Sequence, residues 1–195
     1  MDLFTYMDDE IYRICVSGSH AKENPFQQYL DFLYELGELS EDEQKLYAGI
    51  GREFIQTIET TEMQKVYKMP ILYSFYNHGN IRLAVTDEEV LESWKEFFDT
   101  GTNWKDFPNV NTYEDYKKVT DKQHLSKAKR MPIRFLKASG KGFFVEKDGY
   151  ALALRDEIGD VVGNMAFGEQ MGDVLGYRSL EYYRRRYKKN RSEGD

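Results

Sequence analysis

The sequence predicts a mainly α-helical fold with a small β component (α+β). Apolar residues recur at spacings of three and four along most of the chain, which is typical of amphipathic helices. Capping boxes, in which Ser or Thr is followed three residues later by Glu or Gln, occur at residues 40–43, 86–89 and 120–123 and indicate helix starts. Asp148-Gly149 lies between two short apolar runs, and this dipeptide favours a tight β-hairpin.

The composition is that of a soluble globular protein. Hydrophobic residues make up 41% of the 195 positions and charged residues 31%, which is too apolar for a disordered chain. Cys15 is the single cysteine, so the chain cannot form an internal disulfide, as is usual in a reducing cytosol. No apolar run approaches the roughly 20 residues that span a bilayer, and the acidic N-terminus lacks the basic region of a signal peptide. We therefore expect a cytoplasmic protein without a membrane partner.

Residues 1–60 predict an acidic helical subdomain. A short helix is expected over residues 8–16, followed by a loop. The apolar spacing predicts a helix over residues 25–36, and Gly37 suits its C-terminal end. The first capping box opens one further helix, whose apolar stripe extends over residues 46–58.

Helices and one strand alternate over residues 61–119. A helix is expected from about residue 61 to residue 76. Residues 81–85 alternate apolar and polar side chains, which predicts a short strand. The second capping box opens an amphipathic helix that ends near Phe98. A loop rich in Gly, Asn, Asp and Pro follows, and then a short helix over residues 113–119.

Residues 120–154 are the most informative stretch. The third capping box opens a basic helix that ends near Arg130, and residues 133–139 continue as an amphipathic segment. Two short apolar runs, residues 143–146 and 150–154, then predict the strands of a hairpin.

Beyond the hairpin the patterns are weaker. Residues 155–161 fit either a helix or a turn, and residues 163–172 favour no single element. Residues 179–188 predict a final helix, with Leu180 and Tyr183 facing inward.

The element order from residue 61 to residue 154 is helix, short strand, helix, helical segment, strand, turn and strand. This is the order of a winged-helix domain, with a long insertion before the helix that would enter the major groove. Residues 61–195 are therefore interpreted as a winged-helix-like domain with one β-hairpin, a basic segment and a C-terminal helix.

Charge is divided unevenly along the chain. Residues 1–116 carry 9 basic and 23 acidic residues, whereas residues 117–195 carry 18 basic and 11 acidic residues. Such asymmetry suggests an electrostatic partner, and cations that contact phosphates make nucleic-acid affinity fall with salt. The candidate nucleic-acid-binding residues are Lys117, Lys118, Lys122, Lys127, Lys129, Arg130, Arg134, Lys137, Lys141, Lys147, Arg184, Arg185 and Lys188.

Two other interpretations of the charges remain open. The basic residues can form a solubilising surface without a partner, and those of the final helix also suit the negative end of the helix dipole. The acidic half can instead dock on a basic protein such as a nucleic-acid enzyme. The chain would then be a protein–protein interaction module.

Short aromatic motifs resemble a known family. They are Tyr67-Lys68-Met69-Pro70-Ile71-Leu72, Phe75-Tyr76-Asn77, Gly101-Thr102-Asn103-Trp104, Met131-Pro132-Ile133-Arg134-Phe135-Leu136, Phe143-Phe144, Tyr177-Arg178 and Tyr182-Tyr183. Between residues 61 and 186 these motifs resemble the C-terminal accessory region of bacterial DEAD/DEAH-box helicase-like proteins of the restriction or defence type. The resemblance implies an accessory or substrate-engaging module that is associated with a helicase, in a defence or mobile-element context. Together with the winged-helix order, it predicts DNA, in duplex form, or helicase motor domains as partners.

No catalytic function follows from the sequence. The phosphate-binding loop of ATPases, G-x-x-x-x-G-K-[ST], is absent. The acid-x-Lys fragments at residues 43–45 and 115–117 are too short to indicate a nuclease. Cys15 and the three histidines lack metal-ligand spacing, so neither a metal nor a cofactor is expected.

Trp104 has two candidate roles. It follows Asn103 in a polar loop, where an exposed indole can stack on a nucleic-acid base. Alternatively, the indole anchors the loop against the rest of the domain.

Overall fold

The computed structural model describes the backbone of residues 28–192 and the side chains of residues 28–186. Its elements confirm a mainly α-helical chain with a small β component. The helix predicted over residues 8–16 lies outside the described residues, as do Cys15 and the side chain of Lys188.

Three helices form the first part of the described chain: α2 (Tyr29–Leu36), α3 (Glu41–Tyr47) and α4 (Ile50–Thr60). Gly37 ends α2 in the left-handed conformation, with φ 71°, as its position predicts. The single helix expected after the first capping box is divided in two. Its break lies at Gly49, whose extended backbone precedes α4.

The middle of the chain contains α5 (Lys68–Phe75), β1 (Tyr76–Asn77), β2 (Asn80–Ile81), β3 (Ala84–Val85) and α6 (Asp87–Asp99). The helix predicted from residue 61 begins later, at Lys68. Pro70 then falls in the first turn of α5, where its missing N–H breaks no helical hydrogen bond. The predicted strand over residues 81–85 is divided between β2, which pairs with β1, and β3.

A long helical run follows two short elements, η2 (Asn103–Asp106) and α7 (Tyr113–Lys117). The run comprises α8 (Asp121–Ala128), the π-helical turn η3 (Lys129–Ile133) and α9 (Arg134–Ser139), and we call it the basic helix. Pro132 lies inside η3, where the wider turn accommodates a residue that cannot donate a backbone hydrogen bond.

The predicted hairpin is confirmed, and an earlier strand joins it. β4 (Phe144–Val145) pairs antiparallel with β5 (Leu152–Leu154), and β5 also pairs antiparallel with β3. The strand order is therefore β3–β5–β4. Ala153 is the central partner, since it lies opposite Val145 on one side and opposite Ala84 on the other.

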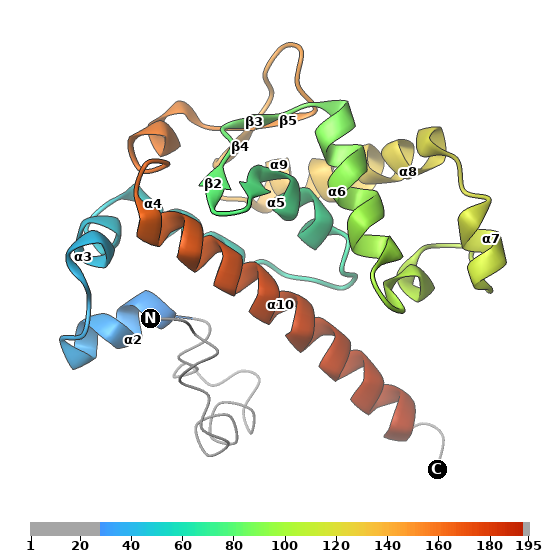
Figure 1. The fold of residues 1–195 in the computed structure, drawn as a ribbon, viewed down its shortest axis with the longest axis horizontal. Helices are drawn as coiled ribbons and strands as arrows, with labels where there is room; N and C mark the ends of the chain where they lie inside the picture. Colours follow the sequence, from blue (N-terminus) through green and yellow to red (C-terminus); the bar gives the residue numbers. More distant parts are fainter. Residues whose placement is uncertain (1–27, 193–195) are drawn as a thin grey trace.

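After the short 3₁₀ helix η4 (Asp156–Asp160), the last described element is α10 (Met165–Ser192), which is far longer than the helix predicted over residues 179–188. Figure 1 shows α10 as a long rod that crosses the molecule, with α2 and α3 near one end of the fold and α7 and α8 near the other. Gly168 is one reason why the sequence predicts a shorter helix, because glycine lowers helix propensity. In the structure, a Cβ at Gly168 would overlap the carbonyl oxygen of Gly79, so the close contact between α10 and the β1–β2 turn requires glycine.

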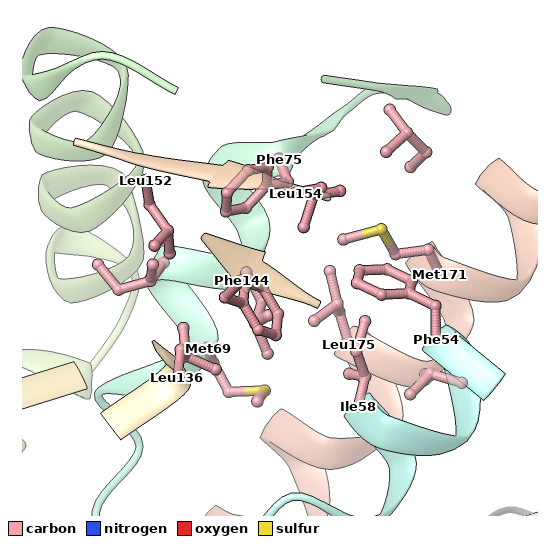
Figure 2. Packing of buried hydrophobic residues seen from close by; sticks show 14 of the residues in the cluster. Phe54, Ile58, Met69, Phe75, Leu136, Phe144, Leu152, Leu154, Met171 and Leu175 are labelled. Carbon is pink, nitrogen blue, oxygen red and sulfur yellow. The ribbon is translucent and has the colours of Figure 1, made fainter. Parts of the chain in front are cut away.

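The main hydrophobic cluster joins α4, α5, the basic helix, the β3–β5–β4 sheet and α10 (Figure 2). Phe54 of α4 is fully buried in this cluster, with its ring centroid 5.3 Å from that of Phe143 and 5.7 Å from that of Phe167. The cluster extends from Leu30 to Tyr182, across the predicted subdomain boundary after residue 60. Helices of the acidic segment thus contribute to the same core that supports the basic helix.

Candidate nucleic-acid interface

The start and the buried side of the basic helix are both fixed by local sequence. Thr120 accepts a hydrogen bond from the backbone N–H of Gln123, and the Gln123 side chain accepts one from the N–H of Thr120 at 2.8 Å. The inward side then buries His124, Ala128 and Leu136. Consequently the opposite side of the basic helix faces solvent.

The solvent side carries cations at a helical spacing. Lys122, Arg130 and Arg134 are exposed, and spacings of four and eight residues bring them to one side of the helical run. Lys141, just after α9, is also exposed and adopts a left-handed backbone with φ 49°. None of these four residues forms an ion pair within residues 28–186. We call Lys122, Arg130, Arg134 and Lys141 the open cations.

Four other predicted cations of this region pair with carboxylates. The ammonium group of Lys129 lies 2.6 Å from a carboxylate oxygen of Asp87, at the start of α6. Lys137 pairs with Glu146. Two exposed pairs are local: Lys117 with Glu114 at 2.6 Å and Lys118 with Asp115 at 3.4 Å. These four lysines therefore offer less charge to a polyanion than the sequence suggests.

Lys127 faces a different environment. Its ammonium group is half-buried, 5.1 Å from the centroid of the Tyr67 ring and 3.5 Å from the Met131 sulfur. Burial lowers the pKa of Lys127, and the neighbouring Arg130 lowers it further. Lys127 thus supports the packing of the helix on α5 through a cation–π contact.

The loop between β4 and β5, residues 146–151, protrudes from the body of the molecule (Figure 1). Lys147 is exposed near its tip, with its ammonium group 5.8 Å from the centroid of the exposed Tyr150 ring. Gly149 has φ 81°, which the tight turn requires. Because Glu146 pairs with Lys137 of α9, the base of this loop lies beside the basic helix.

Three described cations near the end of α10, Arg184, Arg185 and Arg186, interact with other groups of the molecule. Arg186 pairs with the buried carboxylate of Asp106, and Arg185 lies 3.9 Å from Glu181. Arg184 also has an intramolecular interaction. The Arg186 pair joins α10 to η2, whereas Arg185 and Glu181 both lie in α10; the sequence pattern alone did not distinguish these roles from phosphate binding.

Trp104 lies in η2 and is half-buried. Its ring centroid is 5.7 Å from that of Tyr113, and its side chain packs against the main hydrophobic cluster. This position favours the anchoring role over base stacking.

The structure also contains a pocket and a groove that the sequence did not predict. A pocket of about 400 Å³ lies between the end of α4, the start of α5 and the basic helix, and includes Lys68 and Phe135. A groove of about 590 Å³ between α6 and α10 includes Glu92 and Glu96. Neither could be found from the sequence, because each brings together residues from distant helices.

Within the described part of the chain, no cluster of three or more His, Cys, Asp or Glu residues is placed to hold a metal ion. The helices of residues 28–192 include none with the length and apolar character needed to cross a bilayer. Comparisons of the chain with protein-family models, with curated proteins and with solved structures found no match.

Proposed function

We propose that this chain is a non-catalytic nucleic-acid-binding module that presents the basic helix and the β4–β5 loop to duplex DNA. The observation that carries the proposal is the set of open cations, which are exposed and form no ion pair within residues 28–186, while four neighbouring lysines pair with carboxylates. A charge without an intramolecular partner is free to exchange its counterion for a phosphate.

The arrangement of elements supports a winged-helix-like mode of binding. β3 precedes α6 in the sequence and pairs with β5 of the hairpin, so α5, α6, the basic helix and the hairpin form one unit. In helix-turn-helix proteins one helix enters the major groove and adjacent groups contact the backbone. Here the basic helix takes the first role, and Lys147 on the protruding loop takes the second.

The number of open cations sets the expected salt dependence. If Lys147 and the four open cations each contact one phosphate, log K falls with log salt at a slope of about −4.5, from about −0.9 per contact. The chain as a whole carries a net charge of −7, so a patch rather than the total charge must supply the attraction.

Fluorescence anisotropy with a labelled DNA duplex, titrated at several salt concentrations, tests this function. We expect binding at low salt that weakens steeply as salt rises. Absence of binding at low salt, or an affinity that does not change with salt, would remove the proposal.

Association with a helicase, in a defence or mobile-element context, is proposed from the sequence resemblance alone. On this view the module delivers DNA to a separate helicase motor. If this proposal is correct, the isolated chain should bind duplex DNA. It should also co-purify with a helicase motor of the family that its motifs resemble. Failure to co-purify would remove the association and leave the DNA-binding proposal standing.

A second candidate function is docking on the basic surface of a nucleic-acid enzyme, and the groove between α6 and α10 favours it. Glu92 and Glu96 line this groove without an ion pair in the described residues, and the exposed Leu180 lies at its α10 side. Carboxylates beside apolar side chains such as Phe97 and Leu180 suit a basic amphipathic segment. A Lys/Arg-rich amphipathic peptide should bind the native chain and lose affinity to a Glu92→Gln/Glu96→Gln variant; equal binding would exclude docking at this groove.

A further inference from the structure

The pocket beside α9 has the charge pattern of an anion site. Its volume of about 400 Å³ falls within the range of small-molecule sites in proteins. Three ammonium groups line it, from Lys65, Lys68 and Lys141, against one carboxylate, from Glu62. The pocket is therefore electropositive although the chain is acidic.

Lys68 is the least exposed of the three lysines that line the pocket. Its half-buried ammonium group lies 2.9 Å from the Thr61 hydroxyl oxygen and 3.5 Å from the Ser139 hydroxyl oxygen, and forms no ion pair within the described residues. Burial lowers the pKa of Lys68; nearby Glu62 raises it and Arg178 lowers it. An ammonium group has three donors, so one held by neutral hydroxyls retains the capacity to bind an anion.

Apolar side chains of the basic helix also line the pocket. Met131 and Pro132 of the π-helical turn line it together with Phe135, whose side chain is 49% exposed. Wide π-helical turns within α-helices occur frequently at functional sites. An exposed aromatic ring next to cations can stack on a planar heterocycle.

We propose that this pocket binds a nucleoside monophosphate group, with the phosphate at Lys68 and Lys141 and the base against Phe135. The group can come from a free nucleotide or from the phosphorylated end of a nucleic-acid strand. The site is separate from duplex binding along the exposed side of the basic helix, although Lys141 lies at the border of both.

Isothermal titration of the full chain with AMP and with adenosine tests the phosphate requirement. We expect AMP to bind at least tenfold more tightly than adenosine, and Lys68→Gln to abolish that preference. Lys105→Gln is the matched control, because it removes an exposed lysine that neither lines the pocket nor belongs to the open cations. This control should bind AMP as the native chain does.

A second titration, with 5′-phosphorylated and 5′-hydroxyl single-stranded oligonucleotides, separates the two sources. Tighter binding of the phosphorylated than of the 5′-hydroxyl oligonucleotide identifies a strand end; equal binding of the two oligonucleotides, with AMP still bound more tightly than adenosine, identifies a free nucleotide. Phe135→Ala, at a half-exposed position, provides a variant expected to fold and should weaken the binding of AMP.

Equal binding of AMP and adenosine, or no binding of AMP to the folded native chain, would overturn the proposal. Unchanged AMP affinity in both folded variants, Lys68→Gln and Phe135→Ala, would also overturn it. Salt-dependent duplex binding would survive these results, so failure of the pocket and failure of the DNA interface are distinguishable.

Discussion

Lys137 of α9 and Glu146 at the base of the β4–β5 loop form an ion pair that joins the basic helix to the protruding loop. The hydrogen bond and the charge of Lys137 lower the pKa of the Glu146 carboxyl. The pair fixes the base of the loop beside the helix. It also withholds the Lys137 charge from any phosphate.

Replacing this carboxylate should therefore strengthen DNA binding. In a Glu146→Gln variant, Lys137 is released to contact a phosphate, and one negative charge leaves the interface. We expect tighter duplex binding and a salt slope steeper by about 0.9, measured by anisotropy. Thermal stability should change little, since Glu146 is exposed. Glu38→Gln, an exposed change in the acidic segment, controls for net charge; an equal gain in both variants would contradict a local role.

Substitution by alanine should change the free energy of unfolding in opposite directions at two glycines of α10. A Cβ at Gly168 would overlap the backbone of Gly79, so Gly168→Ala should lower the free energy of unfolding by about 1–3 kcal/mol. Nothing lies within 4 Å of a Cβ at Gly176, so Gly176→Ala should raise it by up to about 1 kcal/mol through helix propensity. Urea denaturation measures both changes. Equal effects of the two substitutions would show that the contact between α10 and the β1–β2 turn is not needed for stability.

Glu59 should make stability depend on pH. Its carboxyl is 3% exposed and accepts a hydrogen bond from the N–H of Tyr29 at 3.4 Å; burial raises its pKa to about 8. The folded state therefore binds a proton that the unfolded state releases at a lower pH. Its contribution to stability is complete below about pH 4.5 and is lost as the pH rises towards 8.

Urea unfolding of the native chain and of Glu59→Gln at pH 5 and pH 8 measures this contribution. Gln retains the acceptor oxygen and cannot ionise, so the variant should lose less stability than the native chain between the two pH values. The difference is at most about 5 kcal/mol, from 1.36 kcal/mol per pKa unit. Identical pH dependence of the two proteins would mean that Glu59 ionises in the folded state as freely as in the unfolded state.

Local signals in the sequence were sufficient for several elements. The three capping boxes all form with both of their hydrogen bonds, because they depend only on residues three apart. The hairpin around Asp148-Gly149 forms for the same reason. Gly37 likewise ends α2 through its own backbone preference.

Other features of the fold depend on contacts between residues far apart in the sequence, which local patterns do not predict. The glycines of α10 weaken helix propensity in isolation, and only the approach of Gly79 explains why Gly168 lies inside a long helix. The charge pattern of the sequence likewise did not show which cations form ion pairs in the fold. Lys129 and Arg130 are adjacent in sequence, yet Asp87 from another helix neutralises only Lys129. A pairing between residues 42 positions apart cannot be deduced from composition.

The most direct test of the account compares two double variants that remove equal charge from the same region. Arg130→Gln/Arg134→Gln removes open cations, whereas Lys117→Gln/Lys118→Gln removes lysines already paired with Glu114 and Asp115. Duplex affinity is measured against salt for both. We predict that the arginine variant loses affinity and that its salt slope is shallower by about 1.8, from about 0.9 per phosphate contact, while the lysine variant keeps the native slope. Equal losses in both variants would show that overall charge, and not the unpaired side of the basic helix, governs binding.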